Sequence, residues 1–263
     1  MTLLPSGCYS VSAILTIPGN SKERESKMDT SRKTAMLVGA LFLTAMVTSI
    51  MGGALIEPLL SAPQDLVTLP ANQTQLVSGV LLELVNAIAV IGIAVMMFPI
   101  LRKRTEALAL GYVAIRIIEA LMQIVSDVIP LSLLTSSQRY LIAGTSDVAA
   151  FQATGALWIA ARAQLVGTML GIFFGLGALL FYYALNRYRL VPRWLSIWGL
   201  AGVVPILAWN LSGMFGVDLS AGMILALPII LNEIVLGIWL ILKGFEPSAF
   251  APGSTKQFQA EPV

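Results

Sequence analysis

The chain has 263 residues, of which 57% are hydrophobic and 11% charged, and its net charge is +2. Soluble domains are about half apolar and about a quarter charged, so this composition excludes an ordinary soluble domain and predicts a polytopic membrane protein. The sequence has no histidine and one cysteine, Cys8, which excludes histidine-ligated metal, histidine-dependent catalysis and an internal disulfide. We therefore predict no cofactor and no metal site, and nucleic acid is not an expected partner.

The N-terminal stretch is polar and carries no apolar period. Residues 1–29 are predicted to be a disordered or mis-assigned N-terminal extension, because a second methionine, Met28, stands directly before the first apolar segment. Residues 30–245 form the predicted transmembrane domain. The Pro-, Gly- and Ser-containing residues 246–263 are predicted to be a mobile C-terminal tail.

Six apolar segments are long enough to cross a bilayer, whose hydrocarbon core of about 30 Å takes about 20 helical residues. Backbone groups have no water to bond in lipid, so each segment must be helical. The predicted fold is all-α, a polytopic bundle of six transmembrane helices over about residues 36–56, 76–98, 107–131, 163–183, 195–215 and 222–242.

Lysine and arginine set the expected orientation of the bundle. They gather before the first span, between the second and third, between the fourth and fifth, and after the sixth. Because cytoplasmic connections are enriched in positive charge, we predict a multi-pass protein of the cytoplasmic membrane with both termini cytoplasmic. Residues 132–162 are then the one long external connection, and their apolar patches suggest a short interfacial helix.

The third span carries a polar stripe. At 100° per residue its polar side chains fall within about 80° of each other, and this stripe must face away from lipid: Tyr112, Arg116, Glu119, Gln123 and Asp127. Other polar residues interrupt the second and sixth spans. The predicted buried polar cluster is Glu83, Asn86, Arg116, Glu119, Gln123, Asn232 and Glu233.

Charge is unbalanced in this predicted cluster, since its carboxylates, Glu83, Glu119 and Glu233, face one guanidinium, Arg116. Either protonation or Arg162, reaching in from the border of the fourth span, would restore the balance. Such groups can serve as polar glue between helices, but intramembrane ionisable residues are functional by default. The excess of acid favours binding or movement of a small polar solute or proton.

Two other classes of function stay open. One is a non-catalytic membrane accessory or partner-binding protein. The other, ranked last, is an intramembrane lipid-modifying enzyme with Glu83 and Glu119 as an acid–base pair. A non-enzyme is the expectation.

Glycines at four-residue spacing lie in the fourth span, at Gly167, Gly171 and Gly175. Small residues at this spacing let a neighbouring helix approach closely. Packing within the chain is favoured over a homo-oligomer interface or a contact with a membrane partner.

Several segments resemble bacterial membrane proteins of domain of unknown function family 4386 (DUF4386). They are "SRKTAMLVGALFL", "YVAIRIIEAL", "GIFFGLGALLFYYAL" followed by "RLVPRWLSIWGLAG", and "LNEIVLGIWLILKGF". The resemblance covers about residues 30–245. It implies a six-helix domain in the bacterial cytoplasmic membrane and supplies no activity.

Overall fold

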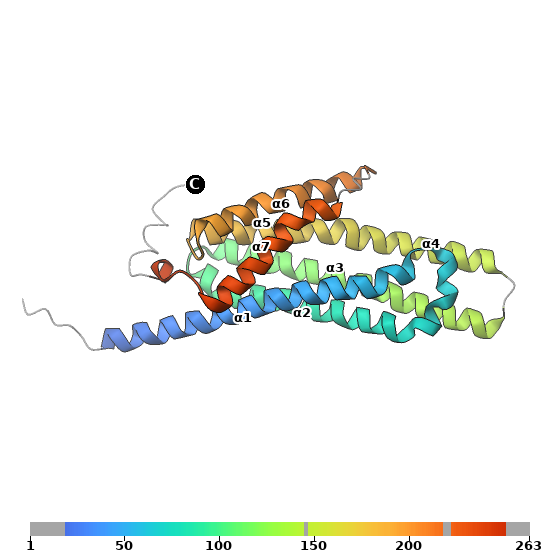
Figure 1. Cartoon of the computed structure of the whole chain (residues 1–263), viewed down its shortest axis with the longest axis horizontal. Coiled ribbons are helices and arrows are strands. Elements are labelled where there is room, and N and C mark those ends of the chain that lie inside the picture. Colours follow the sequence, from blue (N-terminus) through green and yellow to red (C-terminus); the bar gives the residue numbers. More distant parts are fainter. Residues whose placement is uncertain (1–18, 145–146, 218–221, 251–263) are drawn as a thin grey trace, which may run out of the picture.

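A computed structural model describes residues 19–144, 147–217 and 222–250, and no strand occurs among them (Figure 1). The long helices are α1 (Gly19–Ile56), α2 (Gln73–Arg102), α3 (Glu106–Ala143), α4 (Val148–Gln164), α5 (Gly171–Arg187), α6 (Arg193–Met214) and α7 (Gly222–Leu242). Short 3-10 turns are η1 (Glu57–Leu60), η2 (Pro63–Asn72) and η4 (Pro247–Phe250), and a π-turn, η3 (Leu165–Leu170), joins α4 to α5.

In the part of the chain that the structure describes, six helical segments are long and apolar enough to span a membrane, which confirms the predicted number and the all-α class. They are Asp29–Leu60, Gln64–Arg102, Glu106–Ala143, Val148–Arg187, Arg193–Met214 and Ile224–Leu242. Each contains one of the predicted spans or most of it. Hydropathy alone thus located each of the six candidate spans found among the described residues, because a bilayer demands both length and apolar composition.

The spanning helices form a closed ring, in which each packs against the next in the order α1, α2, α3, α5, α6, α7 and back to α1. Glycines make the closest approaches. A Cβ added to Gly39 of α1 would lie 2.5 Å from the carbonyl oxygen of Gly237 on α7, and one added to Gly79 of α2 would lie 3.1 Å from that of Gly52 on α1. Small residues at these crossings let backbones meet directly, the packing that membrane helices favour.

One end of the ring, here called the basic end, holds the α2–α3 and α5–α6 turns and the last turn of α7. Gly244 adopts a left-handed φ of 79° after α7, a conformation that glycine tolerates without strain. Arg32 of α1 donates from Nη2 to the carbonyl oxygen of Leu242 at 2.8 Å. A cation at the C-terminus of a helix interacts favourably with the helix dipole, so this contact fastens α7 to α1.

The other end carries a helical extension, here called the cap: η1, η2, the start of α2, α3 from Ile129 onward, and α4. Figure 1 shows α3 and α4 extending beyond the neighbouring ends of α6 and α7. The cap has its own hydrophobic core, separate from the core of the ring and built from Ile56, Leu60, Leu66, Leu69, Leu76, Val80, Ile129, Leu133 and Leu134.

The cap corrects the prediction for residues 132–162. The sequence suggested a connection with one short interfacial helix, whereas α3 continues to Ala143 and α4 returns antiparallel to it as an extension of α5. Apolar side chains, such as Leu133 and Leu134, pack on η2 instead of on lipid. Ser137 is buried among them, and its hydroxyl donates to the carbonyl oxygen of Leu66 at 2.7 Å.

The chain ends also differ in part from expectation. Residues 19–29, part of the extension predicted to be disordered or mis-assigned, form the start of α1, since lysine, glutamate and arginine are good helix formers. At the other end, the Glu246 amide donates to the Leu190 carbonyl at 2.9 Å, and Arg104 bonds to the carbonyl of Ala249. The predicted tail therefore begins with a docked turn. Residues 1–18, with Cys8, and residues 251–263 lie outside the described residues.

Candidate functional site

The polar stripe of α3 lies inside the bundle. Its members are between 0 and 5% exposed, although they are polar or charged: Tyr112, Arg116, Glu119, Gln123 and Asp127. The opposite face of α3 carries exposed apolar side chains, such as Leu121, Val125 and Val128. The helical period that predicted the stripe from sequence thus also explains its burial.

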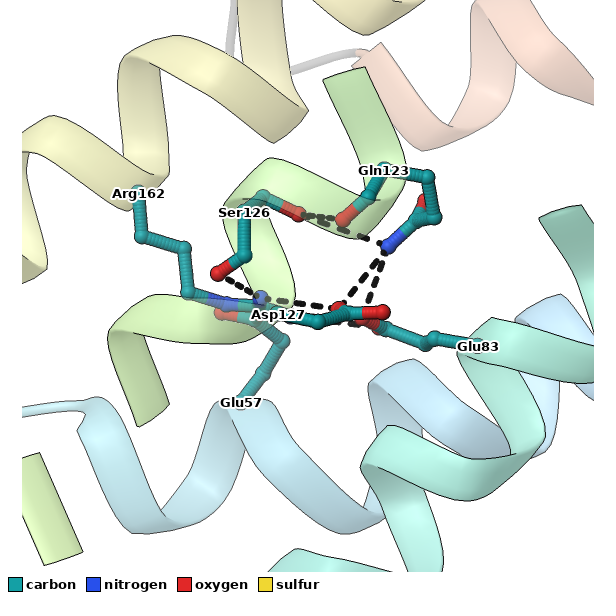
Figure 2. A network of polar contacts seen from close by, with 6 residues as sticks. All are labelled: Glu57, Glu83, Gln123, Ser126, Asp127 and Arg162. Atoms are coloured by element: carbon teal, nitrogen blue, oxygen red, sulfur yellow. Dashed lines mark hydrogen bonds and ion pairs between the residues drawn. The ribbon is translucent and has the colours of Figure 1, made fainter. Parts of the chain in front are cut away.

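The buried charges form two groups along α3. We call the first the cap network: Glu57, Glu83, Gln123, Ser126, Asp127 and Arg162 (Figure 2). We call the second the midspan site: Arg116, Glu119 and Glu233, with Tyr112 and Tyr182 beside them.

Arg162, at the end of α4, is the centre of the cap network. Its Nη2 lies 3.0 Å from Glu83 Oε2 and 3.3 Å from Glu57 Oε1, and its Nη1 lies 3.6 Å from Asp127 Oδ1. Nη1 also donates to the Ser126 carbonyl at 3.1 Å. One guanidinium therefore ties η1, α2 and α3 to α4 at the junction between cap and ring.

Gln123 joins the two acidic groups of this network that are most deeply buried. Its Nε2 donates to Glu83 Oε2 at 2.8 Å and to Asp127 Oδ1 at 3.2 Å. Figure 2 shows both carboxyl groups converging between Gln123 and Arg162. Both oxygens of Glu83 and Oδ1 of Asp127 thus have N–H partners, as buried acids require.

The midspan site is built differently. Arg116 Nη1 lies 2.6 Å from Glu119 Oε2, one turn further along the same helix. The guanidinium also lies over the Tyr112 ring, with Cζ 5.8 Å from its centroid. Arg116 is only 4% exposed, so its charge is neutralised mainly by a partner in its own helix.

Glu233 stands next to the central residue of α7 and faces this pair. Arg116 and Glu119 both interact with it electrostatically, and so does Tyr182 of α5. Glu233 is partly exposed, yet it makes no hydrogen bond and no ion pair with any of the residues that the structure describes. Arg116 Nε and the Tyr182 hydroxyl are buried and also lack a hydrogen-bond partner. The midspan site therefore has unused donors and acceptors.

The predicted single cluster is thus divided. Glu83 bonds to Gln123 and Arg162 and not to Arg116. The reason is distance along α3, because Gln123 and Arg116 are two turns apart, about 10 Å. The sequence left open whether protonation or Arg162 balances the buried carboxylates. In the cap network Arg162 contacts them directly.

Two predicted asparagines take no part in either group. Asn232 is fully buried and its Nδ2 donates to the Leu195 carbonyl of α6 at 2.9 Å, so it links α7 to α6. Asn86 is partly exposed and makes no side-chain hydrogen bond within the described residues. By contrast, sequence reasoning missed Glu57 and Ser126. Glu57 directly follows the first apolar segment, which was the only available signal for it.

The glycines of the fourth span pack within the chain at two of the three positions. A Cβ added to Gly171 would lie 2.1 Å from Asn210 Oδ1, and one added to Gly175 would lie 2.4 Å from Leu207 Cδ2, both on α6. A Cβ added to Gly167 would have no atom of a neighbouring helix within 4 Å among the described residues.

Substitution at these glycines should separate packing within the chain from an interface between copies. Gly175→Leu should lower the free energy of unfolding by about 1–3 kcal/mol through overpacking against α6. Gly167→Leu, the matched control, should leave it nearly unchanged. Thermal unfolding of the purified variants measures both. An equal loss at both positions, together with a shift in oligomeric state, would instead indicate an interface between copies.

Comparison with known proteins identifies one match. Residues 37–244 match the model of the family described as "Domain of unknown function (DUF4386)". No curated protein and no solved structure matches the chain. The matched range contains the whole midspan site and the whole cap network.

Proposed function

Because the chain belongs to the DUF4386 family, whose activity is unknown, we propose from the site itself that it binds a proton or a small polar solute at the midspan site and moves it across the membrane. The observation that carries this proposal is Glu233. It is an acid at the centre of a membrane-spanning helix, and the one cation near it among the described residues, Arg116, is already paired with Glu119.

A structural role explains this arrangement poorly. An ionised side chain at the centre of a bilayer costs about 2.5–3.5 kcal/mol on insertion scales, and one arginine cannot neutralise two glutamates. A proton or a cationic group of a solute would supply the missing charge. The unpaired Arg116 Nε can donate to an acceptor atom elsewhere on such a solute, and the Tyr182 hydroxyl can donate or accept.

The location belongs to the same proposal. The basic end carries most of the lysine and arginine of the turns, which supports a cytoplasmic position for that end and for both termini. Residence in the bacterial cytoplasmic membrane, with the cap outside, fits this charge distribution. The midspan site would then lie about halfway along the path of a solute.

Glu233→Gln tests the proposal directly. In liposomes that contain a pH-sensitive dye, wild-type protein should let protons enter when a potential, negative inside, is imposed. The variant should fall to the rate of empty vesicles, because the amide has nearly the same shape but cannot exchange a proton. Glu106→Gln, which changes an exposed ion pair with Arg102 at the basic end, is the matched control and should keep the wild-type rate.

Proton entry at the wild-type rate in the Glu233→Gln variant would overturn the proposal for a proton. If neither protein conducts protons, thermal unfolding at about pH 5 to 8 is the second readout. A midpoint that varies more steeply with pH in the wild type than in Glu233→Gln would support a titrating site at Glu233. A variant that is simply unstable at every pH would make Glu233 a structural residue.

One observation favours a second candidate, a membrane accessory protein that binds a partner. On α4 of the cap, Leu157 is 69% exposed and Trp158 is 45% exposed. Purification of a stoichiometric partner that is lost in Leu157→Ser would support that function. A lipid-modifying enzyme gains no support, because Glu83 is bonded to Arg162 and Glu119 to Arg116.

A further inference from the structure

We propose that Glu83 and Asp127 form a second proton-binding site in the cap network, where the two carboxyl groups share one proton. A role for this site in passing protons between the cap and Glu233 rests on the proposed function. Proton binding by the Glu83–Asp127 pair does not. The sequence did not predict that Glu83 and Asp127 act together.

Geometry brings the two acids together from different helices. Glu83 of α2 and Asp127 of α3 both accept from the same nitrogen, Gln123 Nε2, at 2.8 and 3.2 Å. Both also face Arg162, at 3.0 and 3.6 Å. The two carboxyl groups therefore lie beside each other between Gln123 and Arg162 (Figure 2). Two carboxylates that close do not both stay ionised at low cost, as paired acids in other proteins show.

Burial decides the charge balance. The side chains of Glu83 and Asp127 are each 7% exposed, whereas that of Glu57, the third acid near Arg162, is 59% exposed. Water can therefore solvate Glu57 but not the other two. Two buried carboxylates facing one buried guanidinium leave one uncompensated negative charge, and a single proton removes it.

An unpaired atom points to the same ligand. Asp127 Oδ2 is buried and has no hydrogen-bond partner, which is costly for an ionised carboxylate. A proton fits this site better than a metal ion does. Sodium and other hard cations need several oxygen ligands, whereas the amide of Gln123 and the guanidinium of Arg162 both present N–H groups here.

Few other titratable groups of the described residues lie around the pair. Arg162 from α4 and Glu57 from η1 face the pair directly. Glu119, one turn before Gln123 on α3, is paired with Arg116. Any proton bound in the cap network should therefore depend on Glu83 and Asp127 and only weakly on Glu57.

The test uses the full chain with Glu233→Gln, so that the midspan site adds no titration at Glu233. If the native state holds one proton that the unfolded chain releases near neutral pH, stability is greatest at low pH and is lost as pH rises. The melting temperature should then fall by roughly 3 °C per pH unit above the onset of titration. Adding Asp127→Asn should remove this slope, and adding Glu57→Gln, the matched control, should leave it.

Infrared spectroscopy provides the second measurement, which does not depend on the stability of a variant. The carbonyl-stretch band of a protonated carboxyl group should appear in Glu233→Gln, disappear when Asp127→Asn or Glu83→Gln is added, and remain when Glu57→Gln is added. A slope and a band that both survive Asp127→Asn would overturn the proposal. So would a slope that appears only with sodium chloride and not with choline chloride, since this would assign the site to sodium.

The two proposals can fail separately. Loss of proton entry in Glu233→Gln, without a band from the Glu83–Asp127 pair, would leave the midspan site standing and remove the second site. A band from the pair, with unchanged proton entry in Glu233→Gln, would do the reverse.

Discussion

Arg162→Met should lower the free energy of unfolding by about 3–5 kcal/mol, because removing one partner of a buried ion pair leaves uncompensated charge. Here the substitution leaves Glu83 and Asp127 buried without their cation. For a chain of this size, the loss corresponds to a melting temperature lower by about 10 °C. Thermal unfolding in detergent measures it.

The loss of stability in Arg162→Met should be confined to one part of the structure. Arg162 ties η1, α2 and α3 to α4, so hydrogen exchange should become faster in the cap, over 63–72 and 148–164, and stay slow in α6. Arg139→Met, which removes an exposed arginine from the same hairpin, is the matched control and should change neither quantity. Uniformly faster exchange across the ring would contradict a role confined to the cap junction.

Arg116→Met should destabilise the protein by a similar amount, about 3–5 kcal/mol. Methionine fills much of the same space, so the loss comes from charge and not from a cavity. Glu119 and Glu233 would then remain near the centre of the membrane with no cation. Equilibrium unfolding at neutral pH and at about pH 5 measures the effect, and the penalty should shrink at the lower pH as the acids take up protons.

A double variant separates the contribution of the pair from that of Glu233. Adding Glu119→Gln to Arg116→Met should recover most of the stability, because a buried pair replaced as a whole costs far less than a broken one. The double variant should still fail to conduct protons if Arg116 positions Glu233. Recovery of stability without recovery of proton transport would therefore show that Arg116 has a role in transport in addition to its role in stability. If the double variant is no more stable than Arg116→Met, the pair with Glu119 is not what holds Arg116 in place.

Much of the architecture could be predicted from the sequence, because the bilayer imposes simple rules. Length and apolar composition located the six spans, and the helical period placed Arg116, Glu119 and Gln123 on one buried face. The choice between partners could not be predicted in this way. Whether Glu83 meets Arg116 or Arg162 depends on how far α2 is shifted along α3, which no single segment encodes.

The cap shows a second limit. In residues 132–162 serine, threonine and glutamine interrupt the apolar pattern, so a hydropathy argument ends the span before the helix ends. The structure continues both helices because Leu133 and Leu134 find a core on η2. Lipid-based reasoning cannot detect such a core, since it forms between protein segments and not against the bilayer.

The ring is closed by its first and last helices, which meet at Gly39 and Gly237. During synthesis α1 lacks its contact with α7 until α7 has left the ribosome. The first five membrane-crossing segments can therefore form only an incomplete ring before that point. The charge of Arg116 is neutralised even in that incomplete ring, because its ion-pair partner Glu119 lies in the same helix and the two enter the membrane as a neutral pair. Glu233 arrives last, and its insertion is the step that completes both the ring and the excess of acid inside it.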